Sequence, residues 1–378
     1  MLPGSTRKPL RLSEFIRTEA ASGVFLMLAA LVALVWANSP WAATYTSFCQ
    51  AKFAFNSSPL LCINDGLMAV FFFVVGLEIK RELLLGELAS AKKAALPIVA
   101  ALGGMAVPAL IYASFNAGGG GSRGWGIPMA TDIAFALGVM NLLGPRIPIA
   151  LKVFLTAVAI VDDVGAVAVI AIFYSEQVQW GLVGGGVAIL AGLAALNRFG
   201  VRHVALYIVS GIVLWALFLK SGIHATVAGV LLAMVIPTDS LESIEHKLQP
   251  FVSYFVMPIF ALANAGVAID SKVVGAMGQP VGLGVLLGLV VGKPIGVVLA
   301  SWLAVKARIA SLPSLVNWRQ MAGVGVLAGI GFTMSLFISD LAFSDPKQID
   351  AAKVSILAAS LIAGTFGYLM LLKRTPSG

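Results

Sequence analysis

Long apolar runs separated by short polar segments make up most of the chain. A helix needs roughly 20 apolar residues to cross a hydrocarbon layer of about 30 Å, and twelve runs approach or exceed that length. Their approximate bounds are 20–38, 60–79, 95–115, 126–143, 149–174, 180–198, 203–220, 222–236, 251–269, 281–304, 319–340 and 351–372. The pattern predicts an all-α polytopic membrane protein with twelve transmembrane helices.

Composition and charge agree with this prediction. Of the 378 residues, 59% are hydrophobic and only 11% charged, and the mean hydropathy is +0.97, far from a soluble globular average. Eighteen of the 25 Lys and Arg fall on the predicted side of the N-terminus and six on the other side. This asymmetry predicts that both termini are cytoplasmic. The bases flank apolar runs and form no basic patch, which argues against a nucleic-acid partner.

Four ionisable residues lie deep inside apolar runs. Asp162 and Asp163 are the tenth and eleventh residues of the 22-residue run Val153–Tyr174, Asp132 lies in the fourth run, and Lys293 in the tenth. A charge at that depth costs several kcal/mol and is tolerated mainly beside a partner or a water-filled cavity. Three acids and one base leave room for a bound cation.

Helix-breaking residues interrupt two of the runs. Pro128 and Gly138 lie in the fourth run, and four glycines precede Thr333 in the eleventh. Runs three to five and ten to twelve are therefore triplets with an interrupted middle member, as in inverted-topology repeats with a midplane site. We predict one transmembrane unit, 1–378, divided into an ion-translocating core and a scaffold that supplies a dimer interface. The predicted core comprises 95–174 and 281–372, and the predicted scaffold 1–94 and 175–280.

These deep carboxylates indicate a site that protons and a hard monovalent cation share. Na⁺ and Li⁺ suit carboxylate, hydroxyl and carbonyl oxygens, and the sequence has no soft ligand cluster for a transition metal. The glycines at 118–121 lack a following Lys-Ser or Lys-Thr and form no phosphate-binding loop. We expect no cofactor.

Three other functions deserve comparison. An intramembrane aspartyl protease needs Tyr-Asp and Gly-x-Gly-Asp motifs, which do not occur, and a serine protease needs a Gly-x-Ser-Gly element to accompany a residue such as His224. We therefore interpret His224 as a packing or helix-start residue. A passive cation channel remains an alternative, although a channel does not need Lys293 to compete with its cation.

The segment between the first two runs carries two further features. Thr44–Phe55 alternates in a strand-like way, which permits a β-hairpin whose edge could pair with another copy. Cys49 and Cys62 match no metal or redox spacing. We expect free thiols, with a disulfide as the alternative.

Two polar patches are candidates for regulation. Glu78, Arg81 and Glu82 share one helical face at the end of the second run. The segment 237–250, expected to be a loop, carries Glu245 and His246, and histidine titrates near pH 6.5. The alternative is a solvated helix end with ordinary ion pairs.

Eight stretches of the chain, taken in order and spacing, resemble the NhaA family of bacterial sodium/proton antiporters over essentially the whole length. They are INDGLMAVFF (63–72), GLEIKREL (76–83), PMATDIAFALGV (128–139), FLTAVAIVDDVGA (154–166), SGIHATVAGV (221–230), FALANAGV (260–267), GKPIG (292–296) and GIGFTMSLFI (329–338). The family is itself a known example of inverted repeats. The resemblance implies an electrogenic, pH-regulated exchanger of Na⁺ or Li⁺ for H⁺, a homodimer of the bacterial inner membrane.

Residue roles also follow from the resemblance. It implies that Asp163 is the principal cation ligand, that Asp162 takes part and can pair with Lys293, and that Thr131 and Asp132 sit where the broken helices cross. Lys293 and Asp132 would compensate the half-helix dipoles there.

The family ties positions matching the two regulatory patches to the cytoplasmic funnel and the pH response. These positions are Glu78, Arg81, Glu245 and His246. Gln249 stands where the best-known family pattern has a further histidine, so the midpoint or steepness of pH control is expected to differ.

Overall fold

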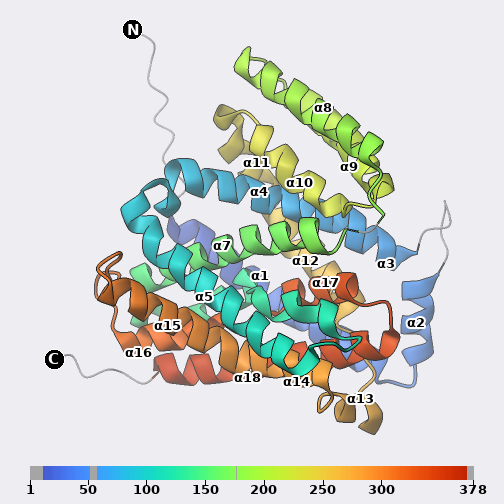
Figure 1. The fold of residues 1–378 in the computed structure, drawn as a ribbon, viewed down its shortest axis with the longest axis vertical. Helices are drawn as coiled ribbons and strands as arrows, with labels where there is room; N and C mark the ends of the chain where they lie inside the picture. Colours follow the sequence, from blue (N-terminus) through green and yellow to red (C-terminus); the bar gives the residue numbers. More distant parts are fainter. Residues whose placement is uncertain (1–11, 52–57, 176, 373–378) are drawn as a thin grey trace.

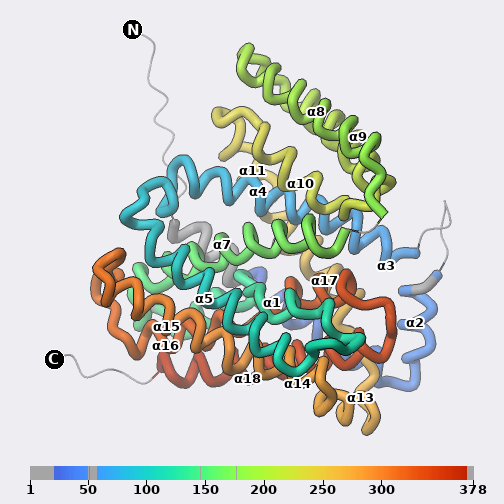
Figure 2. The backbone as a smooth tube through the Cα atoms, in the orientation of Figure 1, coloured from blue at the N-terminus to red at the C-terminus, as the bar shows by residue number. Residues whose placement is uncertain are grey.

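The computed structural model describes residues 12–51, 58–175 and 177–372, and every regular element in these ranges is a helix. Figure 1 shows the helices packed side by side, with α8 and α9 at one edge and α16 and α18 at the opposite edge. The α8–α9 pair packs against α10, and Trp215 of α9 donates to the Asp65 carbonyl of η2 at 2.9 Å. Figure 2 shows that α2 and α3 lie on the side of the molecule opposite to the α15–α16 connection.

The elements are α-helices, labelled α, and short 3₁₀- or π-helical segments, labelled η. In the first half these are α1 (Leu12–Ala37), α2 (Ala42–Gln50), α3 (Pro59–Leu61), η2 (Cys62–Leu67), α4 (Met68–Leu85), η3 (Glu87–Ala89), α5 (Ala91–Asn116), η4 (Ser122–Met129), α6 (Ile133–Leu142), η5 (Gly144–Arg146) and α7 (Ile149–Phe173). In the second half they are α8 (Trp180–Arg198), α9 (Val204–Ser221), α10 (Ala225–Val235), α11 (Thr238–Phe251), η6 (Val252–Val256), α12 (Met257–Asn264), α13 (Ser271–Ala276), α14 (Pro280–Leu287), η7 (Gly288–Gly292), α15 (Lys293–Lys306), α16 (Trp318–Ala328), α17 (Phe332–Ala342) and α18 (Pro346–Leu372).

Each of the twelve predicted runs coincides with a helix or a broken helix. By length and apolar composition, eight helices in the described part of the chain can cross a membrane, or up to ten if each of two bent pairs is one span. The protein is therefore a multi-pass, all-helical membrane protein. The count of twelve spans stays a prediction. So does the cytoplasmic location of the two termini, which include residues outside the described ranges.

Both predicted interruptions are present. In the fourth run, the 3₁₀-helix η4 gives way to extended backbone at 130–132 before α6 begins. In the eleventh run, α16 and α17 are bent by 43° at 329–331. A side chain at Gly329 would approach the Leu289 carbonyl to 2.5 Å, so the second break also needs a residue without a Cβ.

The sequence did not reveal the three π-helical segments found among the described residues. They are η2 at the start of the second run, η6 between α11 and α12, and η7 directly before Lys293. A π-turn inserts one extra residue per turn, which rotates the following side chains relative to those before, and such turns are frequent at functional sites.

The β-hairpin expectation for Thr44–Phe55 is wrong for residues 44–50, which belong to α2, while residues 52–55 lie outside the described ranges. Tyr45 and Cys49, four residues apart, form the buried face of this helix. The Tyr45 hydroxyl lies 2.9 Å from the carbonyls of Leu262 and Ala263. The expectation of free thiols is confirmed for both Cys49 and Cys62.

The segment 237–250, expected to be a loop, belongs to α11 from residue 238 onward. Leu241, Ile244 and Glu245 are all buried, and positions three and four apart lie on one face of a helix. This amphipathic helix packs against α4. The packing brings the two candidate regulatory patches together.

Helices α5 and α15 approach each other closely through glycine. A Cβ at Gly103 would lie 2.4 Å from the Gly296 carbonyl oxygen, and a Cβ at Gly296 would lie 2.1 Å from that of Gly103. Since Lys293 is one turn before Gly296, this contact sets the depth and direction of the lysine side chain.

We expect Gly296→Ala to destabilise the protein by ~1–3 kcal/mol, because the added methyl group forces the two helices apart. Thermal unfolding in detergent would show a lower midpoint. Gly192→Ala is the matched control, since no atom lies within 4 Å of a Cβ at that helical position. Equal midpoints for the two variants would contradict the close-packing interpretation.

Candidate functional site

The two broken segments cross, and Asp132 lies at the crossing. Its backbone N–H donates to the Ile330 carbonyl at 2.7 Å. Its Oδ1 accepts from the Phe135 N–H at 2.9 Å, and its Oδ2 accepts from the Thr333 N–H at 3.2 Å and from the Thr333 hydroxyl. One carboxylate therefore caps the N-termini of both α6 and α17, where negative charge is favourable.

Lys293 occupies the opposite pole of the crossing. Its ammonium donates to the Met129 carbonyl at the end of η4 and to Asp162 Oδ2 at 2.6 Å. Neither side chain of the Lys293–Asp162 pair is exposed. The Ser335 hydroxyl donates to the Ile127 carbonyl at 2.8 Å, so two carbonyls freed by the break receive partners.

Thr131 joins the pair to the second break. Its hydroxyl lies 2.8 Å from Asp162 Oδ2 and 2.8 Å from the Ala328 carbonyl at the end of α16. A hydroxyl has one proton to donate, so these two acceptors share it. A change in the charge of Asp162 therefore alters the hydrogen bond that Thr131 donates to the carbonyl at the end of α16.

Asp163 differs from its neighbour in its surroundings. Adjacent residues point about 100° apart on a helix, so Asp163 turns away from Lys293 and lines a cavity instead. It is only 4% exposed, and its Oδ1, like Oδ1 of Asp162, has no hydrogen-bond partner among the described residues. A buried carboxylate oxygen without a partner is costly, and a bound proton or cation would relieve that cost.

The cavity beside Asp163 is narrow, about 30 Å³, and is enclosed by α1, α4, α6, α7, α11, η6 and α17. Its polar lining combines hydroxyl, amide and carboxyl groups from Ser22, Glu78, Thr131, Asp132, Asp163, Gln249, Ser253 and Thr333. It extends from Asp163 toward Glu78, near the end of α4, and Gln249, near the end of α11. The sequence did not single out Ser22, Ser253 and Thr333 as site residues. Only for Thr333 did the sequence hold a feature that could have identified it, namely the adjacent break at the glycines.

The candidate regulatory residues only partly come together. Arg81 pairs with Glu245 across α4 and α11 and with Glu82, both at 3.2 Å. Glu78 is buried and lines the cavity. His246 is exposed, turned away from Glu245 by its place on the helix.

The titration of Glu245 is displaced. Its pKa is raised to about 7, mainly by burial and to a smaller extent by Glu82 and Glu242, while the Arg81 guanidinium lowers it. The carboxyl is therefore protonated below about pH 7 and forms its ion pair with Arg81 above it.

His224 lies at the start of a helix, in agreement with its interpretation from the sequence. It precedes the first residue of α10, and its Nε2 lies 3.0 Å from the Tyr174 carbonyl. Within the described ranges, no group of three or more His, Cys, Asp and Glu side chains could hold a metal ion.

The Lys293–Asp162 pair allows a test by a double-mutant cycle. Lys293→Met and Asp162→Asn should each destabilise the protein by up to ~3–5 kcal/mol, because each leaves a buried charge without its partner. The double variant should lose less than the sum of the two. Additive shifts in detergent unfolding midpoints would show that the two groups do not depend on each other.

Comparison with known proteins agrees with this architecture. The family model described as Na+/H+ antiporter 1 matches residues 13–371. A protein of Albidiferax ferrireducens named Na(+)/H(+) antiporter NhaA is 53% identical over 96% of this chain and 97% of its own length. Proteins of the same name from Rhodospirillum rubrum and Oleidesulfovibrio alaskensis are 50% and 47% identical, over 95% and 98% of this chain and 96% of each relative. The chain therefore belongs to the Na+/H+ antiporter 1 family.

Proposed function

We propose that this protein exchanges Na⁺ or Li⁺ for protons across the bacterial inner membrane. The observation that carries the proposal is the inequality of two adjacent carboxylates. Oδ2 of Asp162 is held by Lys293 and Thr131, whereas Asp163 lines a polar cavity. Oδ1 of each carboxylate lacks a partner among the described residues. Full-length relatives named as Na⁺/H⁺ antiporters support the same activity.

In this proposal Asp163 is the principal cation ligand, with Asp162, Thr131 and Asp132 completing the site and Lys293 compensating its charge. A cation and protons compete for the Asp163 carboxylate. Since Lys293 already occupies Asp162 Oδ2, arrival of a cation at the pair can weaken the Lys293 contact. That coupling offers a second place where a proton could be gained or lost.

Transport follows alternating access. The side that carries the ends of α4 and α11 faces the cytoplasm, together with both termini, and the cavity at Asp163 is the cytoplasmic approach to the site. The core, 95–174 and 281–372, moves against the scaffold, 1–94 and 175–280, which also forms a homodimer interface. If two protons enter for each Na⁺ that leaves, the exchange is electrogenic, and the membrane potential contributes about 2.3 kcal/mol per 100 mV.

The pH response belongs to the contact between α4 and α11. Glu78, Arg81, Glu82, Glu245 and His246 form the regulatory group in this proposal. As pH rises through about 7, Glu245 ionises and its attraction to Arg81 strengthens. Since α11 leads through η6 into a wall of the cavity, a change in this ion pair can alter access to Asp163.

Exchange is tested in liposomes that contain a pH dye. Adding Na⁺ or Li⁺ outside should alkalinise the lumen, while K⁺ should not. For Asp163→Asn the rate should fall by more than about tenfold, since a loss of ~1.4 kcal/mol in ion binding already has that effect. Asp345→Asn, at an exposed acid outside the cavity lining, should keep the wild-type rate.

A wild-type protein that gives no cation-dependent pH change would refute exchange. Na⁺ passage with no accompanying proton movement would instead identify a channel. A wild-type rate for Asp163→Asn would remove that residue from the site and leave the exchange activity in place.

Glu245→Gln tests the pH response. Because glutamine cannot ionise, the variant should respond to pH as if Glu245 were always protonated, and the midpoint of activation should rise by roughly one unit, equivalent to ~1.4 kcal/mol. Asp239→Asn, at an exposed position on the same helix, is the matched control. Superimposable rate–pH curves for the two variants would exclude Glu245 as a sensor, and an unchanged curve for His246→Ala would exclude His246.

A further inference from the structure

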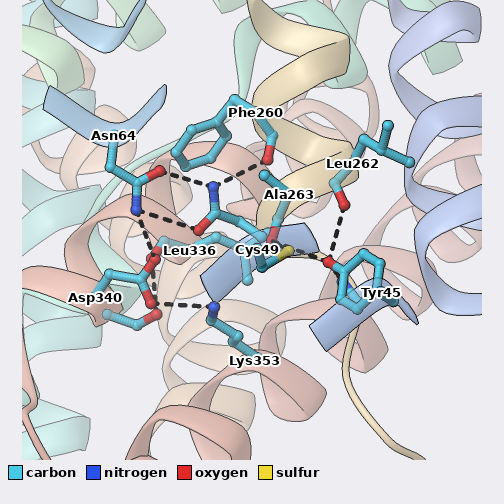
Figure 3. A network of polar contacts seen from close by, with 12 residues as sticks. Tyr45, Cys49, Asn64, Phe260, Leu262, Ala263, Leu336, Asp340 and Lys353 are labelled. Carbon is cyan, nitrogen blue, oxygen red and sulfur yellow. Dashed lines mark hydrogen bonds and ion pairs between the residues drawn. The ribbon is translucent and has the colours of Figure 1, made fainter. Parts of the chain in front are cut away.

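A polar network joins η2, α12, α17 and α18 (Figure 3). It lies at the start of the second predicted span, which is the predicted outer end. It contains Asn64 in η2, Asn264 at the end of α12, Asp340 in α17 and Lys353 in α18. Asn264 is fully buried, and the side chains of Asp340 and Lys353 are only 16% and 12% exposed. The network has no part in the cation site described above.

Each side of the network is ordered independently of the other. In the scaffold, the amides of Asn64 and Asn264 bond reciprocally, at 2.9 and 3.3 Å, and Asn264 also donates to the Phe260 carbonyl. In the core, Lys353 pairs with Asp340 Oδ1 at 3.1 Å. These contacts orient the Asn64 amide and the Asp340 carboxylate whether or not the two are bonded to each other.

One hydrogen bond of this network passes between scaffold and core. Asn64 Nδ2 donates to Asp340 Oδ2 at 3.3 Å. An amide nitrogen has two protons, and the reciprocal pair uses one of them for Asn264 Oδ1. The remaining proton is the one available to Asp340.

An aromatic layer lies one helical turn deeper, between the network and Thr333. Phe337 of the core packs against Phe72 and Phe260 of the scaffold, with ring centroids 5.4 and 6.2 Å apart. All three rings are at most 1% exposed. Near this end, core and scaffold are thus joined by packed rings and by the Asn64–Asp340 hydrogen bond, besides the contact of His224 with the Tyr174 carbonyl. The cavity at Asp163 extends instead toward Glu78 and Gln249.

We propose that the Asn64–Asp340 hydrogen bond is an outer latch, a contact that holds core against scaffold and breaks in every transport cycle. The proposal rests on the alternating-access function above. Its parts suit repeated opening, because Asp340 keeps Lys353 and Asn64 keeps Asn264 after the latch parts, so no buried charge loses its only partner. The position of Asn64 in a π-helical turn, a common place for functional adjustments, agrees with this role.

Cross-linking tests the latch in the full-length protein reconstituted in liposomes. The native thiols are first removed by Cys49→Ala and Cys62→Ser. Asn64→Cys/Asp340→Cys is then treated with a short bifunctional thiol reagent that reducing agent can cleave. Exchange should fall more than tenfold on cross-linking and return on reduction. Asn64→Cys/Asn264→Cys joins two neighbours within the scaffold and should keep its exchange rate when cross-linked.

Undiminished exchange after complete Asn64→Cys/Asp340→Cys cross-linking would overturn the latch, with the exchange function intact. No exchange by the wild-type protein would refute the proposed function itself. If the Asp340 pair is inactive before treatment, Phe72→Cys/Phe337→Cys crosses the same boundary one turn deeper. Reversible inhibition of that pair supports opening at this end, and full activity after its cross-linking overturns it.

Discussion

The helix ends created by two breaks in mid-membrane need partners, and the arrangement of the site follows from how the chain supplies them. No water is available in the hydrocarbon layer to satisfy free amides and carbonyls. Asp132 accepts from the amides that begin α6 and α17, and Lys293 donates to a carbonyl that ends η4. Opposite charges therefore lie at opposite poles of one crossing, and they offset the energetic cost of breaking the backbone hydrogen bonds at that depth.

This solution has a consequence for the two adjacent acids. Lys293 and Thr131 are committed to Asp162, so Asp163 is left facing the cavity without equivalent partners. The same crossing that stabilises the breaks thus creates an unequal pair. Because Asp132 also caps α17, a change of charge at the site acts directly on the start of that helix.

The two ends of the molecule are closed differently. Toward α11, polar side chains line an approach to Asp163 and an ion pair joins α4 to α11. At the other end, packed rings and the contact between Asn64 and Asp340 close the path. Polar contacts therefore join separate helices at both ends of the molecule.

Local pattern determined the helical architecture, the broken fourth and eleventh runs and the four deep ionisable residues. Each of these depends on the length of an apolar run, or on a helix breaker or a charged residue inside it, and all of these can be identified from consecutive residues. Pattern failed at α2, where the spacing of Tyr45 and Cys49 fits a helix as well as a strand and distant carbonyls decided between them, and at α11, whose buried face needs α4. Only the tertiary structure assigned Asp162 to Lys293, placed Thr333 on Asp132 and brought Asn64 to Asp340. These choices depend on contacts between residues far apart in the chain, which no local spacing encodes.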